Sequence, residues 1–226
     1  MEGEHEQYAR GAWTRFHSQP ERTQAVLRAV EGLRIMRALD VGCGAGQELS
    51  PFVLNRAFGV GIDFSPETGL IGRQLYAAQM PDCRVAFARA SGDALPFCSD
   101  AFDVVICRLA LPYMNNACAL SEFARVLRPG GLLFLKIHHA RFYLHKFLRG
   151  LTSQPLSSVH AFRVGISSLV YHLTGHQPAD GYLIKEVFQT VRTLRRELTK
   201  HHLEIQYEMP DSNALTPSFC IARTFA

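Results

Sequence analysis

The sequence is poor in the features that mark membrane, secreted and metal-binding proteins. Among its 226 residues no run of about 18 apolar residues occurs, so we expect no membrane-spanning helix. The first ten residues, MEGEHEQYAR, are acidic and polar, unlike the basic start and apolar core of a secretory signal. The six cysteines form no CxxC pair, which argues against zinc sites and a disulfide framework. We therefore expect a cytoplasmic protein whose thiols are reduced and mostly buried.

Acidic residues are scarce in one part of the chain. Between Lys136 and His202, ten lysines and arginines stand against three acidic residues, a local charge of +7 in a chain of formal net charge +4. Eight of the ten histidines lie in the same stretch. The whole chain is 47% hydrophobic and 19% charged, as in an ordinary globular domain. The excess of positive charge between Lys136 and His202 therefore bears on what this stretch binds and not on the fold of the chain.

Short apolar runs separated by helix-length segments precede this basic stretch. Strands that are apolar on both faces and alternate with helices form a parallel sheet covered on both sides. The expected strands are 37–41, 57–63, 83–89, 102–107 and 131–137. The expected helices are two stretches within 5–32, then 47–56, 66–79, 116–127 and an amphipathic helix over 185–201.

The pattern changes after Ile137. Residues 138–202 show helical periodicity and no convincing strand. Two extended runs, 203–209 and 218–225, then end the sequence and are joined by turn-forming residues. We expect a single domain in which N-terminal helices (1–34) cover the site, 138–202 is a helical insertion, and the last two strands form a hairpin at the sheet edge.

Three glycines follow the first expected strand, in ALDVGCGAGQELSPF. Gly42, Gly44 and Gly46 lie where a strand gives way to a helix, and bare backbone at the positive end of a helix admits a ligand. The GxGxG spacing differs from the dinucleotide fingerprint GxGxxG, whose third glycine would fall at Gln47. The alternative is a tight turn that binds nothing.

Acidic residues follow the next two strands. Asp63 ends the second strand, where a carboxylate can accept both hydroxyls of a ribose. Alternatively Asp63 or Ser65 caps the helix entered at Pro66, and we expect Ser65 to do so. Asp93, in the loop after the third strand, could offer its carboxylate, together with the Ala94 N–H, to an adenine edge; the alternative is an ordinary loop acid.

Taken in order, the segments LDVGCGAGQEL, GVGIDFSPE, GDALPFCSDAFDVVIC and RVLRPGGLLFLKI resemble the class I S-adenosylmethionine-dependent methyltransferases, in particular the type 11 group. The resemblance covers residues 38–137 and the terminal hairpin. It implies an α/β fold with a Rossmann-like, doubly wound sheet of seven strands in the order 3-2-1-4-5-7-6, strand 7 antiparallel, and a helical insertion between strands 5 and 6. It also implies S-adenosyl-L-methionine as the cofactor.

The same resemblance assigns residues to that cofactor. The GxGxG loop would lie under the methionine part, with Asp40 at its start. Asp63 matches the acid that binds the ribose, with Phe64 as its apolar neighbour. Arg108 and Leu109 fall where the methionine end meets the acceptor. The full implied set is Asp40, Gly42, Cys43, Gly44, Gly46, Asp63, Phe64, Asp93, Ala94, Arg108 and Leu109.

The acceptor is indicated less directly. The segment RLALPYMNN, after the fourth strand, lacks the Asn-Pro-Pro-Tyr signature of methyltransferases that act on amino groups of nucleic-acid bases or glutamine, which favours an oxygen acceptor. His138 and His139 leave the fifth strand at its carboxyl end and are the candidate general bases, because histidine titrates near working pH. The alternative is that one points into the insertion and the other is solvated. The histidines lack metal-ligand spacing, so we assign no metal.

Three partners suit the basic and aromatic insertion. It could close as a lid over a small acceptor, lie on lipid headgroups, or bind RNA. We favour a lid, and with it a hydroxyl of a sugar, a lipid-linked molecule or a secondary metabolite. RNA methylation comes second, because the net charge is modest and no separate binding domain is present. A non-catalytic cofactor-binding protein is the third reading; we expect no DNA partner and either a monomer or a homodimer.

Overall fold

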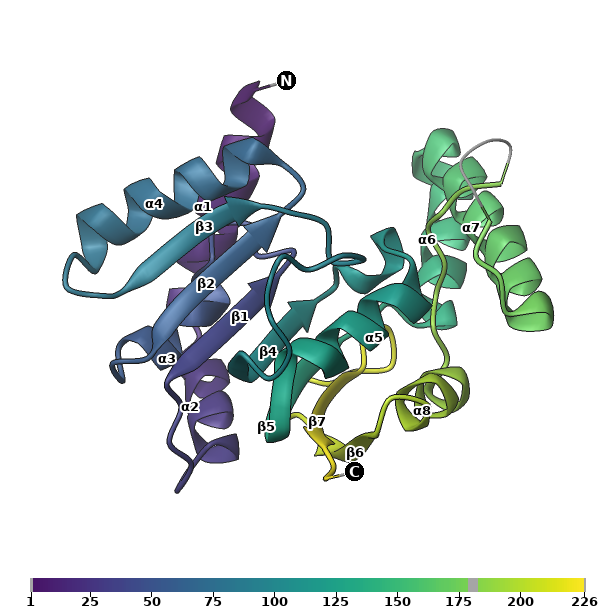
Figure 1. Cartoon of the computed structure of the whole chain (residues 1–226). Coiled ribbons are helices and arrows are strands. Elements are labelled where there is room, and N and C mark those ends of the chain that lie inside the picture. The colour runs from purple at the N-terminus through teal and green to yellow at the C-terminus, as the bar shows by residue number, and fades with distance from the viewer. Residues whose placement is uncertain (1, 179–182, 226) are drawn as a thin grey trace.

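Seven strands form one sheet in the order β3-β2-β1-β4-β5-β7-β6, as the computed structural model shows for residues 2–178 and 183–225 (Figure 1). The strands are β1 (Arg37–Val41), β2 (Phe58–Asp63), β3 (Val85–Arg89), β4 (Phe102–Arg108), β5 (Leu127–Lys136), β6 (Leu203–Glu208) and β7 (Ser218–Arg223). β7 pairs antiparallel with both β5 and β6, whereas β1 to β5 pair in parallel. The expected fold class and strand order are confirmed.

Helices cover both faces of this sheet, and two more stand beside it. The helices are α1 (Glu2–His17), α2 (Pro20–Ala29), α3 (Ser50–Val53), α4 (Pro66–Gln79), α5 (Asn116–Val126), α6 (Ala140–Ser153), α7 (Pro155–Thr174) and α8 (Val191–Thr199), with short 3-10 turns η1 (Gln47–Leu49) and η2 (Leu111–Tyr113). α6 and α7 pack side by side as a hairpin beyond the β5 side of the sheet (Figure 1).

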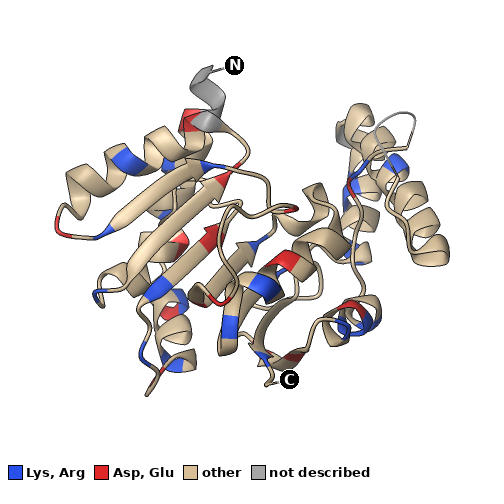
Figure 2. Cartoon of the chain, in the orientation of Figure 1, with Lys and Arg blue, Asp and Glu red and all other residues tan. Residues whose placement is uncertain are grey.

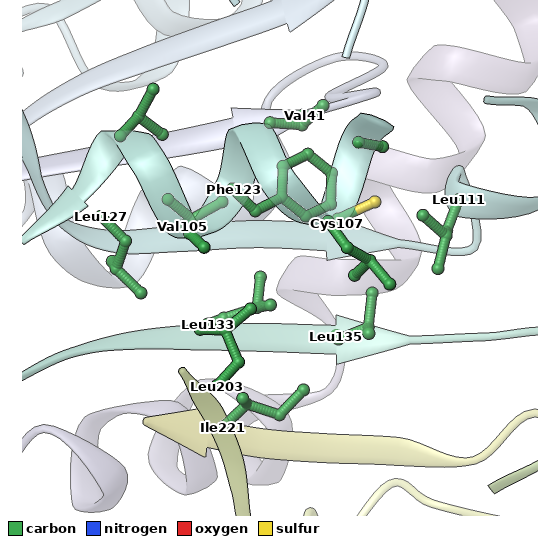
Figure 3. Packing of buried hydrophobic residues seen from close by; sticks show 14 of the residues in the cluster. Val41, Val105, Cys107, Leu111, Phe123, Leu127, Leu133, Leu135, Leu203 and Ile221 are labelled. Carbon is green, nitrogen blue, oxygen red and sulfur yellow. The ribbon is translucent and has the colours of Figure 1, made fainter. Parts of the chain in front are cut away.

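Two apolar cores lie on opposite faces of the sheet. Along β4, Val104 and Ile106 point into the core made with α1 to α4, while Val105 and Cys107 point into the core made with α5 and α8. Figure 3 shows this second core, where Phe123 of α5 packs over the sheet. Alternation along one central strand therefore places helices on both faces, as the doubly apolar strands predict.

The N-terminal helices are tied to the body near the glycine loop. Trp13 of α1 is buried, donates its Nε1–H to Gln79 at 2.9 Å, and packs edge-on against Tyr76 of α4. Arg22 of α2 pairs with the buried Glu48, which follows the glycines. Both helices thus contact elements that leave the carboxyl edge of the sheet.

The expected helix over 185–201 is wrong in its first third. α8 begins only at Val191, where Thr190 and Thr193 form a reciprocal capping box. The preceding residues form a loop because their N–H groups bond to other elements. These bonds run from Ile184 to Ser167 Oγ, from Val187 to the Pro112 carbonyl, from Phe188 to Ser168 Oγ and from Gln189 to the His138 carbonyl. Residues 179–182 of the insertion lie outside the described part of the chain.

The expected helix over 47–56 is also shorter than the pattern suggests. It consists of η1 and the four residues of α3, and it ends at Val53. Arg56 then takes a positive φ of 67°, and the Ala57 N–H folds back onto the Phe52 carbonyl. The chain thereby turns within four residues to enter β2.

The cysteines are less buried than the sequence predicts. All six are free thiols. Cys43, Cys107 and Cys220 are buried within the sheet region, whereas Cys98 and Cys118 are exposed. The expectation that most thiols are buried therefore holds for only half of them.

Candidate active site

The candidate site lies at the carboxyl edge of β1, β2 and β4. β1 pairs in parallel with β2 on one side and β4 on the other, so the chain leaves β1 and β4 in opposite directions along the sheet. Ligands of open parallel sheets bind at such a switch point. The glycine loop follows β1, Asp63 ends β2 and Arg108 ends β4, so the structure brings the main predicted motifs to one place.

The three loop glycines have different reasons for lacking a side chain. Gly42, Gly44 and Gly46 all take positive φ angles, of 71°, 53° and 75°. A Cβ atom at Gly42 would lie 2.3 Å from the Ala110 Cβ, and one at Gly46 would lie 2.6 Å from the Phe87 ring. At Gly44 no described atom lies within 4 Å of such a Cβ. Two glycines therefore serve packing within the protein, and Gly44 is the one whose bare backbone faces open space.

Asp63 is oriented by backbone donors on both sides. Its Oδ2 accepts the Gly44 N–H at 3.0 Å, and its Oδ1 accepts the Ser65 N–H at 3.0 Å. Ser65 occupies the N-cap position of α4, but its side chain makes no capping bond, so the expected role of Ser65 is wrong. Each carboxylate oxygen has a second lone pair, so Asp63 can still accept two ligand hydroxyls.

Asp40, the residue before the last of β1, carries a buried carboxylate oxygen just ahead of the same loop. The residue is 2% exposed, and its Oδ2 has no hydrogen-bond partner among the described residues. Burial, reinforced by the charge of Asp63, raises the pKa of Asp40 to about 7. The Gln47 Oε1 is also buried and unpartnered among the described residues. Two such acceptor atoms fit a ligand group rich in N–H donors, such as an ammonium.

Arg108 belongs to a network of ion pairs rather than standing free. Its Nε lies 3.1 Å from Glu48 Oε1, and its terminal nitrogen pairs with Asp211. Arg22 of α2 shares Glu48, and Lys136 lies 2.9 Å from Asp211. Burial alone would raise the pKa of Asp211, but Arg108 and Lys136 hold this pKa at about 2. A cavity of about 300 Å³ lies between these side chains and α2.

Asp93 is held in place by the body and by the insertion. Its Oδ1 accepts the Asn115 N–H at 2.8 Å, and its Oδ2 lies 2.7 Å from Lys185 Nζ. The Ala94 N–H donates to the Ser91 carbonyl at 3.3 Å, which uses the donor that was expected to face adenine. The adenine role of this loop stays a prediction, and Lys185 is a neighbour that the sequence analysis missed.

The remaining predicted cofactor residues lie around the same edge. Phe64 is 73% exposed, and the Arg89 guanidinium stands 5.2 Å from its ring centroid. Leu109 takes a positive φ of 63° and donates its N–H to the Lys136 carbonyl. Its successor, Ala110, is the residue that packs against Gly42.

His138 starts a chain of polar groups that leads into the insertion. Its buried ring stacks on Phe142 at 4.2 Å, and its Nδ1 lies 3.4 Å from the Tyr143 hydroxyl. Tyr143 donates to Glu186 Oε1 at 2.6 Å, and His160 Nε2 lies 3.0 Å from Glu186 Oε2. Because the Tyr143 proton goes to Glu186, the His138 Nδ1 carries the donor and its Nε2 keeps a lone pair. Burial lowers the pKa of His138 to about 4, so the ring is neutral near pH 7.

His139 is placed differently from its neighbour. Its Nδ1 accepts the Arg141 N–H at 3.3 Å and caps α6. In the neutral ring the proton then sits on Nε2, which leaves no free lone pair for accepting a proton. Burial lowers its pKa as well. The two adjacent histidines therefore have different chemical environments, which their sequence does not distinguish.

The described ranges contain neither a cluster of metal ligands nor a helix suited to a membrane. Within residues 2–178 and 183–225, no group of three histidine, cysteine or acidic side chains is arranged to hold a metal ion. In the same ranges no helix combines the length and apolarity needed to cross a bilayer.

Comparison with known proteins agrees with this geometry. Residues 39–135 match the family model described as a methyltransferase domain. This part of the chain is therefore similar to methyltransferase domains. It contains the glycine loop, Asp63, Asp93 and Arg108, whereas α1, α2 and the hairpin lie outside the matched range.

Two relatives extend the comparison. The chain is 32% identical over 117 residues to a ubiquinone/menaquinone biosynthesis C-methyltransferase of Geotalea daltonii, covering 50% of each chain. It is 30% identical over 139 residues to a ubiquinone biosynthesis O-methyltransferase of Parvibaculum lavamentivorans, covering 59% of this chain and 54% of that one. The chain spans about half the length of the curated relatives it matches.

A solved structure shows the same fold over nearly the whole chain. Magnesium protoporphyrin IX methyltransferase of Synechocystis PCC 6803, solved with bound S-adenosylhomocysteine, superposes with a TM-score of 0.61. The superposition covers 97% of this chain and 84% of that one at 16% identity. At this identity the likeness shows the fold, and it includes the sheet edge at which the candidate site lies.

Proposed function

We propose that this protein binds S-adenosyl-L-methionine and transfers its methyl group to a small-molecule acceptor. The observation that carries the proposal is the buried Asp40 oxygen, which has no described partner and lies at the start of a loop whose Gly44 faces open space. A protein that did not bind a ligand there would bear the cost of an unsatisfied buried carboxylate without compensation.

The residues of the loop suit the parts of this cofactor. Asp40 and Gln47 offer acceptors for the ammonium of its amino-acid end. Asp63 keeps lone pairs for the ribose hydroxyls, and the exposed Phe64 ring offers an apolar surface for the adenine. When bound, the cofactor supplies an electrophilic methyl group on its sulfonium. The chain's own task is then to align an acceptor with that group and to exclude water.

For the general base we propose His138 rather than His139. The Nε2 of His138 has a free lone pair because Tyr143 and Glu186 orient the ring, whereas the Nδ1 lone pair of His139 caps α6. The neutral ring suits proton acceptance near pH 7, although its low pKa makes it a weak base. This favours an acceptor that is already acidic. The name of one relative, a ubiquinone biosynthesis O-methyltransferase, agrees with an oxygen of a lipid-linked or secondary metabolite, whereas another is named as a C-methyltransferase of the quinone pathway.

Calorimetry tests the proposal. We would titrate S-adenosylmethionine and S-adenosylhomocysteine into the wild type and into Asp63→Ala, with Asp82→Ala, an exposed acid before β3, as the matched control. We expect binding to the wild type and the control and at least about a tenfold weaker affinity in Asp63→Ala, since a lost charge-assisted bond is worth about 1.5–3 kcal/mol. A wild type that binds neither compound would refute the function.

A further inference from the structure

An apolar stripe runs along the outside of the α6–α7 hairpin. Side chains spaced three or four residues apart share one face of a helix. On α6 the exposed members are Leu144 (58%), Leu148 (56%) and Leu151 (60%). On α7 they are Leu156 (87%), Val159 (57%), Phe162 (55%), Leu169 (58%) and Leu173 (78%). Eight large apolar side chains are thus exposed on two adjacent helices, and a concentration of exposed apolar side chains of this kind marks an interaction site.

Apart from Phe162, whose ring centroid lies 6.4 Å from that of Phe147 on α6, the hairpin does not need this stripe for its own packing. Its inner face is built from small residues that let the helices approach closely: a Cβ at Gly150 would lie 2.4 Å from Ser158 Oγ. Ser167 and Ser168 are fully buried and accept backbone N–H groups from the following loop. The exposed leucines are therefore not needed to hold the two helices together.

The charge of the hairpin indicates what covers the stripe. Residues 138–178 contain four lysines and arginines (Arg141, Lys146, Arg149 and Arg163) and no aspartate or glutamate. Figure 2 shows both helices with basic positions and no acidic ones. Arg141 and Arg149 are exposed; Arg141 lies one turn before the exposed Leu144, and Arg149 directly follows the exposed Leu148. Exposed basic side chains thus border the exposed leucines of α6, a combination typical of helices at a lipid interface.

We propose that the α6–α7 hairpin docks on the surface of a bilayer that contains anionic phospholipids. The leucines and Phe162 would enter the boundary between headgroups and acyl chains, and the arginines would contact phosphates. A second copy of the chain suits the face less well, because the exposed Arg141 and Arg149 of both hairpins would meet, and neither α6 nor α7 carries an aspartate or glutamate. RNA would match the charge but would leave the apolar stripe in water.

Docking would bring the candidate site toward the bilayer. α6 begins at Ala140, directly after His138 and His139 at the carboxyl end of β5, so the hairpin leaves the sheet at the edge where the site lies. A lipid-soluble acceptor could then reach the site without crossing much water. This consequence rests on the proposed methyl transfer, whereas docking itself does not.

Vesicle sedimentation tests the docking. The full chain would be incubated with vesicles of phosphatidylcholine alone and with vesicles that also contain phosphatidylglycerol. The double variant Leu148→Asp/Leu156→Asp removes apolar contact, and Leu70→Asp, an equally exposed leucine on α4, is its matched control. Arg149→Glu reverses one charge on the hairpin, with Arg195→Glu on α8 as its control.

We expect the wild type, Leu70→Asp and Arg195→Glu to sediment with the anionic vesicles, and the double variant to stay in solution. Arg149→Glu should partition about 25-fold less, since each unit charge near an anionic surface changes partitioning about fivefold. A wild type that binds no vesicles, or hairpin variants that bind like their controls, would overturn the proposal. So would a dimer in analytical centrifugation that the double variant dissociates. Calorimetry with the cofactor on the same samples separates this outcome from a failure of the proposed function.

Discussion

Asp40 and His138 should impose opposite pH dependences on folding stability over the same interval. The pKa of Asp40 is raised from 3.8 to about 7, so between these values the unfolded chain has lost a proton that the folded chain keeps. Stability attributable to Asp40 therefore falls as pH rises. The pKa of His138 is lowered from 6.5 to about 4, so the unfolded chain holds the extra proton and stability rises with pH.

The magnitudes follow from the shifts. Each group changes the free energy of unfolding by about 1.4 kcal/mol per pH unit within its interval, which is about 3 kcal/mol between about pH 4.5 and 6.5. Both residues are buried, at 2% and 8% exposure, so solvent screening reduces neither contribution much. In the wild type the two slopes cancel over this range.

Urea unfolding of Asp40→Asn and His138→Asn at several pH values separates the two slopes. The stability of Asp40→Asn relative to the wild type should rise by about 3 kcal/mol from about pH 4.5 to 6.5, and that of His138→Asn should fall by as much. Asp82→Asn, at an exposed position, is the matched control and should track the wild type. A difference between Asp40→Asn and the wild type that stays constant with pH would refute the assignment of a buried, protonated Asp40.

Two further predictions concern the cofactor loop and its link to the insertion. Gly42→Ala should lower the free energy of unfolding in urea by about 3 kcal/mol, because the new Cβ would lie 2.3 Å from the Ala110 Cβ and the backbone is left-handed. Gly44→Ala places its Cβ near no described atom, so it should lower the free energy of unfolding by only about 1 kcal/mol. Its main effect should be weaker cofactor binding in calorimetry. Lys185→Met should lower the free energy of unfolding by less than about 1 kcal/mol and weaken cofactor binding about threefold, because it releases Asp93. Lys185→Arg should restore the affinity. Equal loss of stability in both glycine variants, or no effect of Lys185→Met on binding, would contradict these expectations.

The sheet was predictable because its determinants are local and repeated. Each of the first five strands is a short apolar run followed by a helix-length segment, and alternation along β4 alone implies a core on each face. The strand order and the antiparallel β7 came from resemblance to a family and were confirmed. The predicted ends of helices were less accurate where a turn overrides helical preference, as at Arg56 after α3.

Only the site residues that belong to sequence motifs were predictable, and their hydrogen-bond and ion-pair partners were not. Asp40, Gly44 and Asp63 belong to motifs that the sequence carries in one stretch each, and the structure brings them together. Their partners come from distant positions: Lys185 pairs with Asp93, and Glu186 with Tyr143, across a loop that no local pattern marks. Periodicity specifies which face of an element is apolar, but it carries no information about which polar side chains meet across elements.

The loop before α8 shows why local preference failed there. A helix continuing back to residue 185 would move the N–H groups of Val187, Phe188 and Gln189 away from their present acceptors. It would leave Ser168 and two buried carbonyls without these donors. It would also withdraw Glu186 from the Tyr143 hydroxyl and remove the partner of His160. Several buried polar groups would then lose their hydrogen bonds, at about 1–3 kcal/mol each, against propensity differences below about 1 kcal/mol per residue. The tertiary bonds therefore outweigh the helical periodicity, and the loop that results connects the hairpin to both His138 and Asp93.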